Sequence, residues 1–271
     1  MFEEIKKIPY ITARNFRMLY TYKLALSVSF ISVVFNVFYM ILFGGMFGVS
    51  NPETISQYQG NFISYLLVGS IGWSFLWSIM AATSDSLTEE MELGPFESIL
   101  LTPTKVRTLM FSYSLYGCVI GLIVLIILTL VGFFLFGVSV FANASIFTVI
   151  IFILSIIMML GFGMVFGGLT IWLKNIGVTV ELLRDIATFF CGVYFPVAVI
   201  PEVFQPIARY FPFYYSITGL RLSLTSTTTL PQIMFYVYIL FILSISITLI
   251  GLVILKIGLN KAKKDGSLAF Y

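Results

Sequence analysis

The chain has 271 residues, of which 59% are hydrophobic and 10% are charged, and its formal net charge is +3. Soluble domains carry about 25% charged residues, so a globule of this length could not hide so much apolar surface from water. The composition excludes an ordinary soluble domain and predicts an all-α integral membrane protein.

The first predicted element is a helix over residues 1–23 that lies in the cytoplasmic membrane interface. Its apolar face carries Ile5, Thr12, Phe16 and Leu19, and its charged face carries Glu3, Lys7, Arg14 and Arg17. An amphipathic helix of this kind lies with its apolar side in the headgroup region. A basic anchor that only sets the topology is the alternative, and use of the helix as a docking surface stays open.

Six transmembrane helices are predicted from stretches that lack charge for long enough to cross the bilayer. A crossing of roughly 30 Å takes about 20 helical residues. The spans are expected near residues 24–47, 61–83, 108–136, 146–173, 179–199 and 233–255. The third and fourth spans form a hairpin, because the uncharged stretch from Thr108 to Leu173 is too long for one crossing and is broken at Gly137–Ser145.

Two pairs of glycines in this hairpin, Gly117 with Gly121 and Gly163 with Gly167, are each spaced four residues apart. Small residues at this spacing allow two membrane helices to approach closely. The spacing is frequent by chance, so the pairs are a weak indication of helix contacts.

The positions of the Lys and Arg residues predict the orientation. All but Arg209 and Arg221 lie in the N-terminal segment, in the regions after the second and fourth spans, or at the end of the chain. Since basic residues favour the cytoplasmic side of a membrane, both termini, including the tail 257–271, are expected in the cytoplasm. We expect a multi-pass protein of the cell (plasma) membrane.

The loop at residues 85–107 is the longest polar insertion on the predicted cytoplasmic side. It contains five acidic residues, Asp85, Glu89, Glu90, Glu92 and Glu97. A break at Gly94 is followed by a predicted short helix, because Pro95 suits a first helical position and Pro103 closes the helix. Its apolar face, made of Phe96, Ile99 and Leu100, would face water or headgroups unless something covers it. The helix either docks a cytoplasmic partner or lies on the membrane surface with a solvated acidic edge.

Three charged residues, Glu181, Arg184 and Asp185, lie about one helical turn apart at the start of the fifth span. Side chains at this spacing are neighbours on a helix, so a local ion-pair cluster is predicted. A charge at the bilayer centre costs roughly 2.5–3.5 kcal/mol on insertion scales, so the cluster should lie near the interface. It is either a structural salt bridge or a lever that transmits movement.

After the fifth span, residues 200–231 combine prolines with aromatic side chains. The segment is too apolar to float in water and its prolines argue against a straight crossing, so short re-entrant or interfacial helices are predicted. The residues expected to form an outer gate are Phe195, Pro196, Pro201, Pro206, Phe211 and Pro212. An aromatic belt at the interface is the alternative.

Several kinds of site have no signature in the sequence. No G-x-x-x-x-G-K-[ST] loop occurs, so we expect no ATP bound through a P-loop of this chain. Histidine is absent and paired carboxylates are not evident in the spans, so no catalytic or metal site is expected. The spans also lack a clear mid-membrane charge, which disfavours an ion-coupled transporter without excluding one.

Two segments resemble the ABC transporter type-2 permease family. Residues 92–103 read ELGPFESILLTP, which resembles the family's E-x-G-T-x-E-x-L-L-x-T-P loop, with Pro95 where the family more often has Thr. The stretch from Gly192 to Arg221, with its repeated prolines, is similar to the family's segment after the fifth span. The two motifs in this order and the six-span layout extend the resemblance over essentially the whole chain.

The resemblance implies a type-2 ABC permease fold and an ATP-driven exporter that moves an amphipathic, drug-like or lipid-like substrate outward. The implied partners are two copies of a separate P-loop ATPase, which would bind ATP and Mg, and a second copy of this chain or a paralogous permease. No cofactor in this chain and no nucleic acid are expected. The implied ATPase-coupling residues are Glu90, Glu92, Gly94, Pro95, Phe96, Glu97 and Leu100, with Lys174 and Asn175 as a second contact.

The resemblance also implies that helices between residues 201 and 224 form the outer gate, with Glu181, Arg184 and Asp185 as a candidate lever. The alternative from another class is an ion-coupled secondary transporter or channel that works without an ATPase. An intramembrane enzyme and an assembly factor without transport are weaker alternatives.

Overall fold

The computed structural model describes residues 2–21, 23–46, 62–92, 94–174, 176–224 and 229–264, and within them it is all-helical. The helices are α1 (Phe2–Thr21), α2 (Lys23–Met46), α4 (Phe62–Glu92), α5 (Pro95–Leu100), α6 (Val106–Phe136), α7 (Ile146–Leu173), α8 (Gly177–Phe190), the 3-10 helix η1 (Val197–Val199), α9 (Gln205–Tyr210), α10 (Pro212–Ser223) and α11 (Leu230–Lys264).

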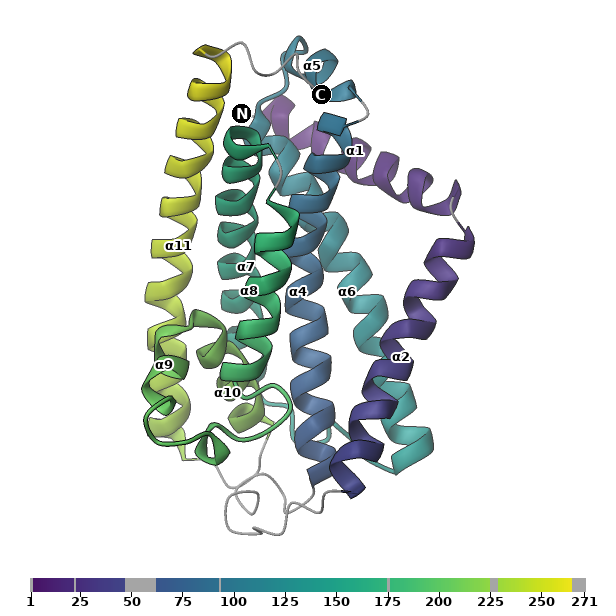
Figure 1. Cartoon of the computed structure of the whole chain (residues 1–271), viewed down its shortest axis with the longest axis vertical. Helices are drawn as coiled ribbons and strands as arrows, with labels where there is room; N and C mark the ends of the chain where they lie inside the picture. The colour runs from purple at the N-terminus through teal and green to yellow at the C-terminus, as the bar shows by residue number, and fades with distance from the viewer. Residues whose placement is uncertain are drawn as a thin grey trace.

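The long helices run side by side, and the short ones lie at the two ends of the bundle (Figure 1). One end carries α1, α5 and the last turn of α11, and we call it the α5 end. The opposite end carries α9 and α10, and we call it the α10 end. α2, α4, α6, α7, α8 and α11 all run between the ends, while α1 lies across the α5 end.

Within the described residues, four helices are long and apolar enough to cross a membrane, namely α4, α6, α7 and α11. α2 has 24 residues and is about 36 Å long at 1.5 Å per residue. α8 has only 14 residues, about 21 Å, which is less than the roughly 30 Å of a hydrocarbon core. Four membrane helices are therefore supported, and the count of six crossings stays a prediction.

Helix ends agree with the prediction where a turn or cap determines them. α6 ends at Phe136 because Gly137 adopts a left-handed φ of 66°, which glycine tolerates best. The Gly137 N–H then donates to the Phe133 carbonyl at 3.1 Å, as in a common helix C-cap. α7 begins after Ser145, whose side chain forms a reciprocal capping box with Thr148. The predicted hairpin between residues 136 and 146 is confirmed.

Two helices are longer than the predicted spans. α4 continues to Glu92 although the span was predicted to end near residue 83, so residues 85–92 of the predicted loop 85–107 are helical. α11 continues to Lys264, into the predicted tail. Both helices extend past the predicted spans for the same reason. The first charged residues mark the edge of the hydrocarbon, but a helix can continue into water beyond that edge.

One helix is shorter than predicted. α8 ends at Phe190, whereas the fifth span was expected to reach residue 199. The chain turns at Gly192, which has a φ of 70°, and Pro196 then precedes the 3-10 helix. A stretch of apolar residues without charge is compatible with the hydrocarbon of the bilayer, but this does not make it one continuous helix.

Glycines bring α7 and α11 into close contact. A Cβ atom at Gly161 would lie 2.7 Å from the Thr248 backbone nitrogen, and one at Gly251 would lie 2.5 Å from the Gly161 carbonyl oxygen. Gly168 and Gly258 repeat this contact seven residues further along each helix. Since small residues are what lets membrane helices pack this closely, the two backbones form a tight seam.

The glycine pairs predicted from the hairpin lie against α4 instead. A Cβ atom at Gly117 would lie 2.5 Å from the Ser78 carbonyl oxygen, and one at Gly163 would lie 2.8 Å from the Thr83 side chain. α4 is therefore the central helix, in contact with both α6 and α7. Close helix approach at these pairs is confirmed.

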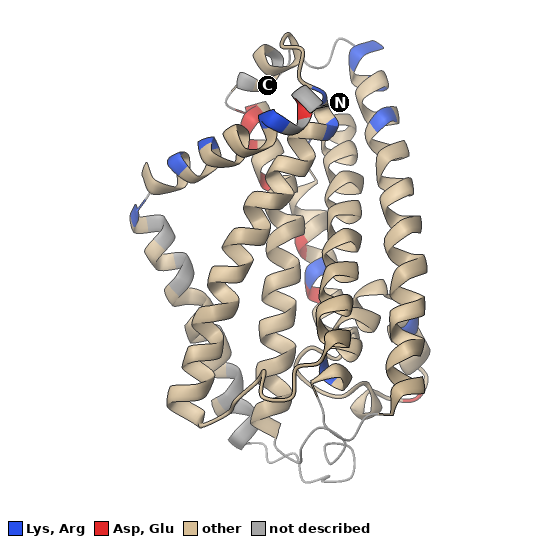
Figure 2. Cartoon of the chain, turned by 180° about the vertical axis from the view of Figure 1, so that it is seen from behind, with Lys and Arg blue, Asp and Glu red and all other residues tan. Residues whose placement is uncertain are grey.

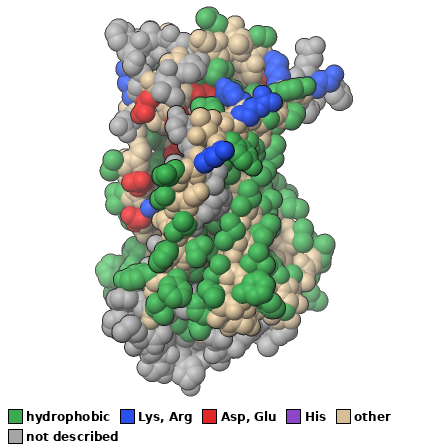
Figure 3. All heavy atoms as spheres, turned by 90° about the vertical axis from the view of Figure 1, so that its right-hand side faces the viewer, with side chains coloured by type: hydrophobic (Ala, Val, Ile, Leu, Met, Phe, Trp, Pro, Cys, Tyr) green, Lys and Arg blue, Asp and Glu red, His purple; other side chains and the backbone are tan. Residues whose placement is uncertain are grey.

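Charged and apolar side chains are segregated on the surface. Lys and Arg residues gather on α1 and on the last turns of α11, at the α5 end (Figure 2). Hydrophobic side chains cover much of the face drawn in Figure 3, with basic side chains above them. This distribution agrees with lipid contact along the bundle and with basic residues at one interface.

Candidate functional site

α5 is a short helix fixed to the bundle by one aromatic side chain. The turn before it uses Gly94 at a φ of 89°, a conformation that favours glycine. Phe96 is only 2% exposed. It lies in a hydrophobic cluster with Leu87, Met91, Leu109, Met110 and Tyr113. The chain itself therefore covers Phe96, which positions α5 and is not available to a partner in this conformation.

The exposed side of α5 centres on a residue that the sequence reasoning missed. Leu101, just after the helix, is 89% exposed. Its exposed neighbours are Glu92, Gly94, Ser98, Thr102 and Pro103. Leu100 is half-buried, and the side chains of Pro95 and Glu97 lie outside the described part. An exposed leucine side chain among polar residues is the kind of apolar group that becomes buried when a partner protein binds.

The second predicted contact lies at the same end of the molecule. Lys174 caps α7 at a left-handed φ of 69°, which is uncommon for a residue other than glycine, and it is half-buried. Asn175 lies outside the described residues. α8 begins at Gly177, so few residues separate it from the end of α7.

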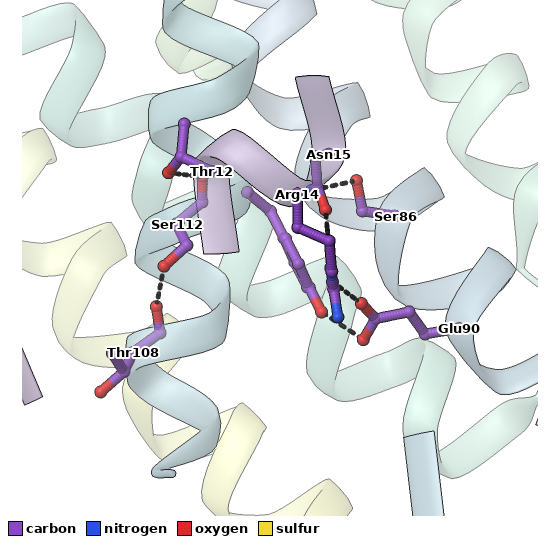
Figure 4. Close-up of polar contacts among 8 residues, drawn as sticks. Thr12, Arg14, Asn15, Ser86, Glu90, Thr108 and Ser112 are labelled. Atoms are coloured by element: carbon purple, nitrogen blue, oxygen red, sulfur yellow. Dashed lines mark hydrogen bonds and ion pairs between the residues drawn. The ribbon is translucent and has the colours of Figure 1, made fainter. Parts of the chain in front are cut away.

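Glu90 connects three helices. It lies on α4 and is 7% exposed. Its carboxylate accepts hydrogen bonds from the Arg14 guanidinium of α1 and from the Tyr113 hydroxyl of α6 (Figure 4). Asn15 extends the contact, because its oxygen accepts from Arg14 Nη2 at 3.2 Å and its amide donates to Ser86 Oγ at 3.5 Å. A buried carboxylate with two strong donors joins these elements firmly.

The neighbouring side of α1 packs on α6. Thr12 Oγ1 donates to the Ser112 carbonyl at 3.2 Å (Figure 4). The Phe16 ring stands edge-on to Tyr116, with 5.0 Å between ring centroids. Thr12 and Phe16 belong to the face that the sequence assigned to the membrane, and here that face contacts α6.

Glu4 holds the start of α6. Its Oε2 accepts from Thr108 Oγ1 at 2.6 Å and from the Lys105 backbone N–H at 3.2 Å. Its Oε1 pairs with Lys7 Nζ at 3.0 Å, and Lys7 also donates to the Pro103 carbonyl at 3.1 Å. The Thr108 hydroxyl, the Lys7 ammonium and the Lys105 N–H together lower the pKa of Glu4 to about 2.

α1 therefore holds the chain on both sides of α5. We call the polar side chains that do so the α1 clamp: Glu4, Lys7, Arg14, Glu90, Thr108 and Tyr113. No local sequence signal reveals the clamp, because Arg14 and Glu90 are 76 residues apart and the helical pattern alone assigns Arg14 to the solvated face.

The three predicted lever residues lie on α8, and two of them form an ion pair. Arg184 Nε is 3.6 Å from Asp185 Oδ1; the Asp185 side chain is exposed and Arg184 is half-buried. The Arg184 guanidinium lies 5.8 Å from the ring centroid of Trp77 on α4. Glu181 is exposed one turn earlier. A partly exposed pair of adjacent residues adds little stability. α8 is joined to the bundle centre by the contact of Arg184 with Trp77 and by its buried Val180 and Ala187, which belong to the core cluster.

The predicted outer segment folds into short helices at the α10 end. Pro206 and Pro212 lie in the first turns of α9 and α10, where the missing N–H costs nothing. Pro201 is exposed and Pro196 is buried. Phe211 joins α9 to α10.

Aromatic contacts link this segment to the end of α8. The Phe211 ring stacks on Phe190, with centroids 6.3 Å apart, and the Phe195 ring meets Phe189 edge-on at 5.1 Å. The outer segment and α8 are therefore joined by paired rings, which are worth more than their buried area alone.

Arg221, on α10, is the second polar centre that the sequence reasoning missed. It is 4% exposed. Its Nη1 donates to the Tyr65 hydroxyl at 2.8 Å and to the Gly192 carbonyl, and its Nη2 donates to the Val193 carbonyl at 2.6 Å. The guanidinium also lies 3.6 Å from the Tyr65 ring centroid. One side chain thus joins α4, α10 and the turn after α8.

Residues 8–225 match the family described as ABC-2 type transporter. The chain belongs to the ABC-2 type transporter family. The resemblance found in the sequence is confirmed, and a comparison with curated proteins finds no match.

As an ABC-2 permease, the chain is a membrane-embedded subunit of an ABC transporter. The matched residues begin in α1 and end just after α10, so they include α5, the lever residues, the outer segment up to residue 225 and Arg221. α11 lies beyond the match and packs against α7.

Proposed function

We propose that this permease exports an amphipathic, drug-like or lipid-like substrate, driven by a separate P-loop ATPase that binds the exposed side of α5. One observation carries the proposal: α5 buries Phe96 inside the bundle while the next turn exposes Leu101. A helix mounted in this way receives a partner on one side and passes its movement to the membrane helices on the other.

The mounting supports transmission of force. Phe96 lies in one cluster with side chains of α4, α6, α7 and α11, and a close-packed interior transmits displacement because it has little free volume. The α1 clamp holds both chain segments that flank α5, at Glu90 and at Thr108. α5 therefore moves together with the bundle, and a displacement of Leu101 by a bound partner is passed to α4, α6, α7 and α11.

A second route leads through α8. The turn at Lys174 lies at the α5 end, and the proposed ATPase contact there includes Asn175. Movement of this turn would tilt α8, with Arg184 sliding along Trp77. Since the far end of α8 is joined by Phe190 to Phe211, the tilt would reach the outer segment. Glu181, Arg184 and Asp185 act in this proposal as the lever.

The outer segment serves as the exit gate. It is built from the prolines and aromatic residues Phe195, Pro196, Pro201, Pro206, Phe211 and Pro212. Between it and α4 lies an aromatic group in which Phe213 contacts Trp73 at 5.6 Å and Phe162 at 4.8 Å between centroids. We propose that an uncharged aromatic lining near the gate suits an amphipathic substrate.

The proposed assembly has two permeases and two ATPases. The second permease is another copy of this chain or a paralogue, and ATP with Mg binds to the ATPase. ATP drives the permease only if the complex binds it more tightly in one conformation. We propose six crossings with both termini and α5 in the cytoplasm, in the cell (plasma) membrane, and export toward the α10 end.

The test is capture of the ATPase. The chain is co-expressed with a candidate P-loop ATPase from the same organism, purified in detergent, and assayed for bound ATPase. Leu101→Asp is expected to lower the amount bound by about tenfold, the loss typical of a central apolar anchor. Val203→Asp changes an equally exposed residue at the α10 end and should bind as the unmodified chain does. Equal binding by both variants would exclude α5 as the docking site.

A further inference from the structure

The contacts of Arg221 place a buried positive charge where the outer segment joins the bundle. Tyr65 and Gly69 of α4 lie on one side, and the Gly192 and Val193 carbonyls on the other. Tyr65 lies one turn from the start of α4, near the α10 end. The site is thus close to the predicted outer interface, where a charge is tolerated more easily than at the bilayer centre.

The carbonyl groups that Arg221 binds follow directly on α8. A helix C-terminus carries a partial negative charge, and a guanidinium placed there is stabilised. Gly192 adopts its left-handed φ of 70°, and its carbonyl accepts from both Arg221 and the Tyr65 hydroxyl, the latter at 3.0 Å. The end of α8 is therefore held by α4 and α10 together.

α4 is shaped to admit this contact. A Cβ atom added to Gly69 would collide with Arg221 Nη2 and with the Val193 carbonyl oxygen. A residue without a side chain at this position lets the guanidinium and the turn approach the α4 backbone. The close approach and the hydrogen bonds are independent observations, and both indicate that these three segments are fixed to one another here.

We propose that Arg221 is the latch of the outer gate. While its guanidinium holds the Gly192 and Val193 carbonyls against Tyr65, the turn after α8 and α10 stay closed on α4. Opening requires these hydrogen bonds to be released together, so Arg221 sets how easily the gate moves. The role of the outer segment as a gate rests on the proposed function. The attachment of α4, α10 and the turn after α8 through Arg221 does not, because it involves this chain alone.

The chain carries its own reporters for this latch. Cys191 precedes Gly192 and is 0% exposed, so it reacts with a maleimide only when this turn opens. Cys118 is half-buried on α6, away from the turn. The alkylation rates of the two thiols therefore separate local opening from general loosening of the fold.

The experiment measures N-ethylmaleimide labelling of both cysteines by mass spectrometry on the purified chain in detergent. Arg221→Gln is expected to speed labelling of Cys191 by about tenfold or more, the factor that loss of a charge-assisted hydrogen bond predicts. Arg221→Lys should give a rate of Cys191 labelling between those of the unmodified chain and Arg221→Gln. An ammonium group cannot bind two carbonyls and stack on Tyr65 as a planar guanidinium does. Labelling of Cys118 should not change.

Two other variants keep the test informative if Arg221→Gln does not fold, and Tyr65→Phe is the milder of them. Tyr65→Phe removes one hydroxyl partner, and Gly69→Ala inserts a methyl group into the contact, so both should speed labelling of Cys191 alone. The matched control is Arg209→Gln, which changes the exposed arginine of α9 and should have no effect. Unchanged labelling of Cys191 in these variants would overturn the latch, as would a parallel rise at both thiols.

A second arm separates this inference from the proposed function. The same labelling is repeated on the complex with its ATPase, with and without ATP. An ATP-dependent change at Cys191 that Arg221→Gln abolishes supports a latch under ATP control. If Arg221→Gln speeds labelling in the isolated chain but ATP changes nothing in the complex, the latch stands and the ATP-driven gate fails.

Discussion

The two ends of the bundle are held together by different chemistry. At the α5 end, Phe96 sits in a hydrophobic cluster, and the α1 clamp joins α1 to α4 through the Arg14–Glu90 ion pair and to α6 through the hydrogen bond from Thr108 to Glu4. At the α10 end, Arg221 is held by Tyr65 and by two backbone carbonyls after α8. The first end has several independent attachments and should move as one body. The second is held by the contacts of one buried arginine and by the ring pairs Phe190–Phe211 and Phe189–Phe195, and we expect it to open when Arg221 is released.

The largest effect is expected from removing the central attachment of the α5 end. Phe96→Ala deletes a buried phenyl ring and leaves a cavity, which should lower the free energy of unfolding by about 3 kcal/mol. The measurement is denaturant unfolding of the purified chain in detergent. Leu101→Ala, which changes an exposed side chain one turn away, should leave stability unchanged. A Phe96→Ala variant as stable as Leu101→Ala would mean that α5 is not mounted in this way.

A smaller loss is expected from the clamp. Glu90→Ala leaves the Arg14 guanidinium and the Tyr113 hydroxyl without their shared acceptor. The free energy of unfolding should fall by about 2 kcal/mol, which is less than is usual for breaking a buried ion pair, because Arg14 can turn toward water. α1 should also become easier to cleave by trypsin at Arg14 and Arg17. Glu92→Ala, on the exposed side of the same helix end, is the control. Equal protection of α1 in both variants would show that the clamp does not hold it.

A substitution at the α10 end should loosen that end without lowering the stability of the whole bundle by much. Tyr65→Phe removes a hydroxyl that contacts both Arg221 and Gly192, and the expected cost is about 1 kcal/mol. Thermal unfolding in detergent should shift only slightly, while exchange of the amide hydrogens around Gly192 becomes faster. If exchange rises equally along all the long helices, the α10 end is not an independent unit and the contrast between the ends fails.

The smallest effect is expected at Glu4, and it depends on pH. Its pKa is lowered from 4.5 to about 2, so its contribution to holding α1 is complete above about pH 4.5 and is lost as the pH falls through about 2. Glu4→Gln should therefore speed amide exchange in α1 relative to the unmodified chain at pH 5. The difference between the two should shrink as the pH approaches 2. A difference that persists unchanged at pH 2 would exclude the charge of Glu4 as its cause.

The sequence predicts what depends on local chemistry. Stretches without charge locate the apolar helices, and Gly137 with Ser145 defines the ends of the α6–α7 hairpin. The short helix after Gly94 follows from Pro95. These features need only neighbouring residues, so a single sequence contains enough information for them.

The sequence does not reveal contacts between distant segments. Arg14 meets Glu90, and Arg221 meets Tyr65 across 156 residues, and no periodicity encodes such pairs. The same limit explains Phe96, which was expected to face a partner and instead packs on α4 and α6. Which side of a short helix is buried depends on what folds against it, so Leu101 as the exposed residue became evident only in the structure.

The central claim is that a separate ATPase drives this permease through α5. It is tested most directly by transport of a fluorescent amphipathic substrate in sealed vesicles that contain the permease with its ATPase, with matched vesicles that contain the permease alone. We expect transport to require both ATP and the ATPase. Leu101→Asp should abolish it, and Val203→Asp should leave it intact. Transport by the permease alone, sustained by an ion gradient without ATP, would contradict it.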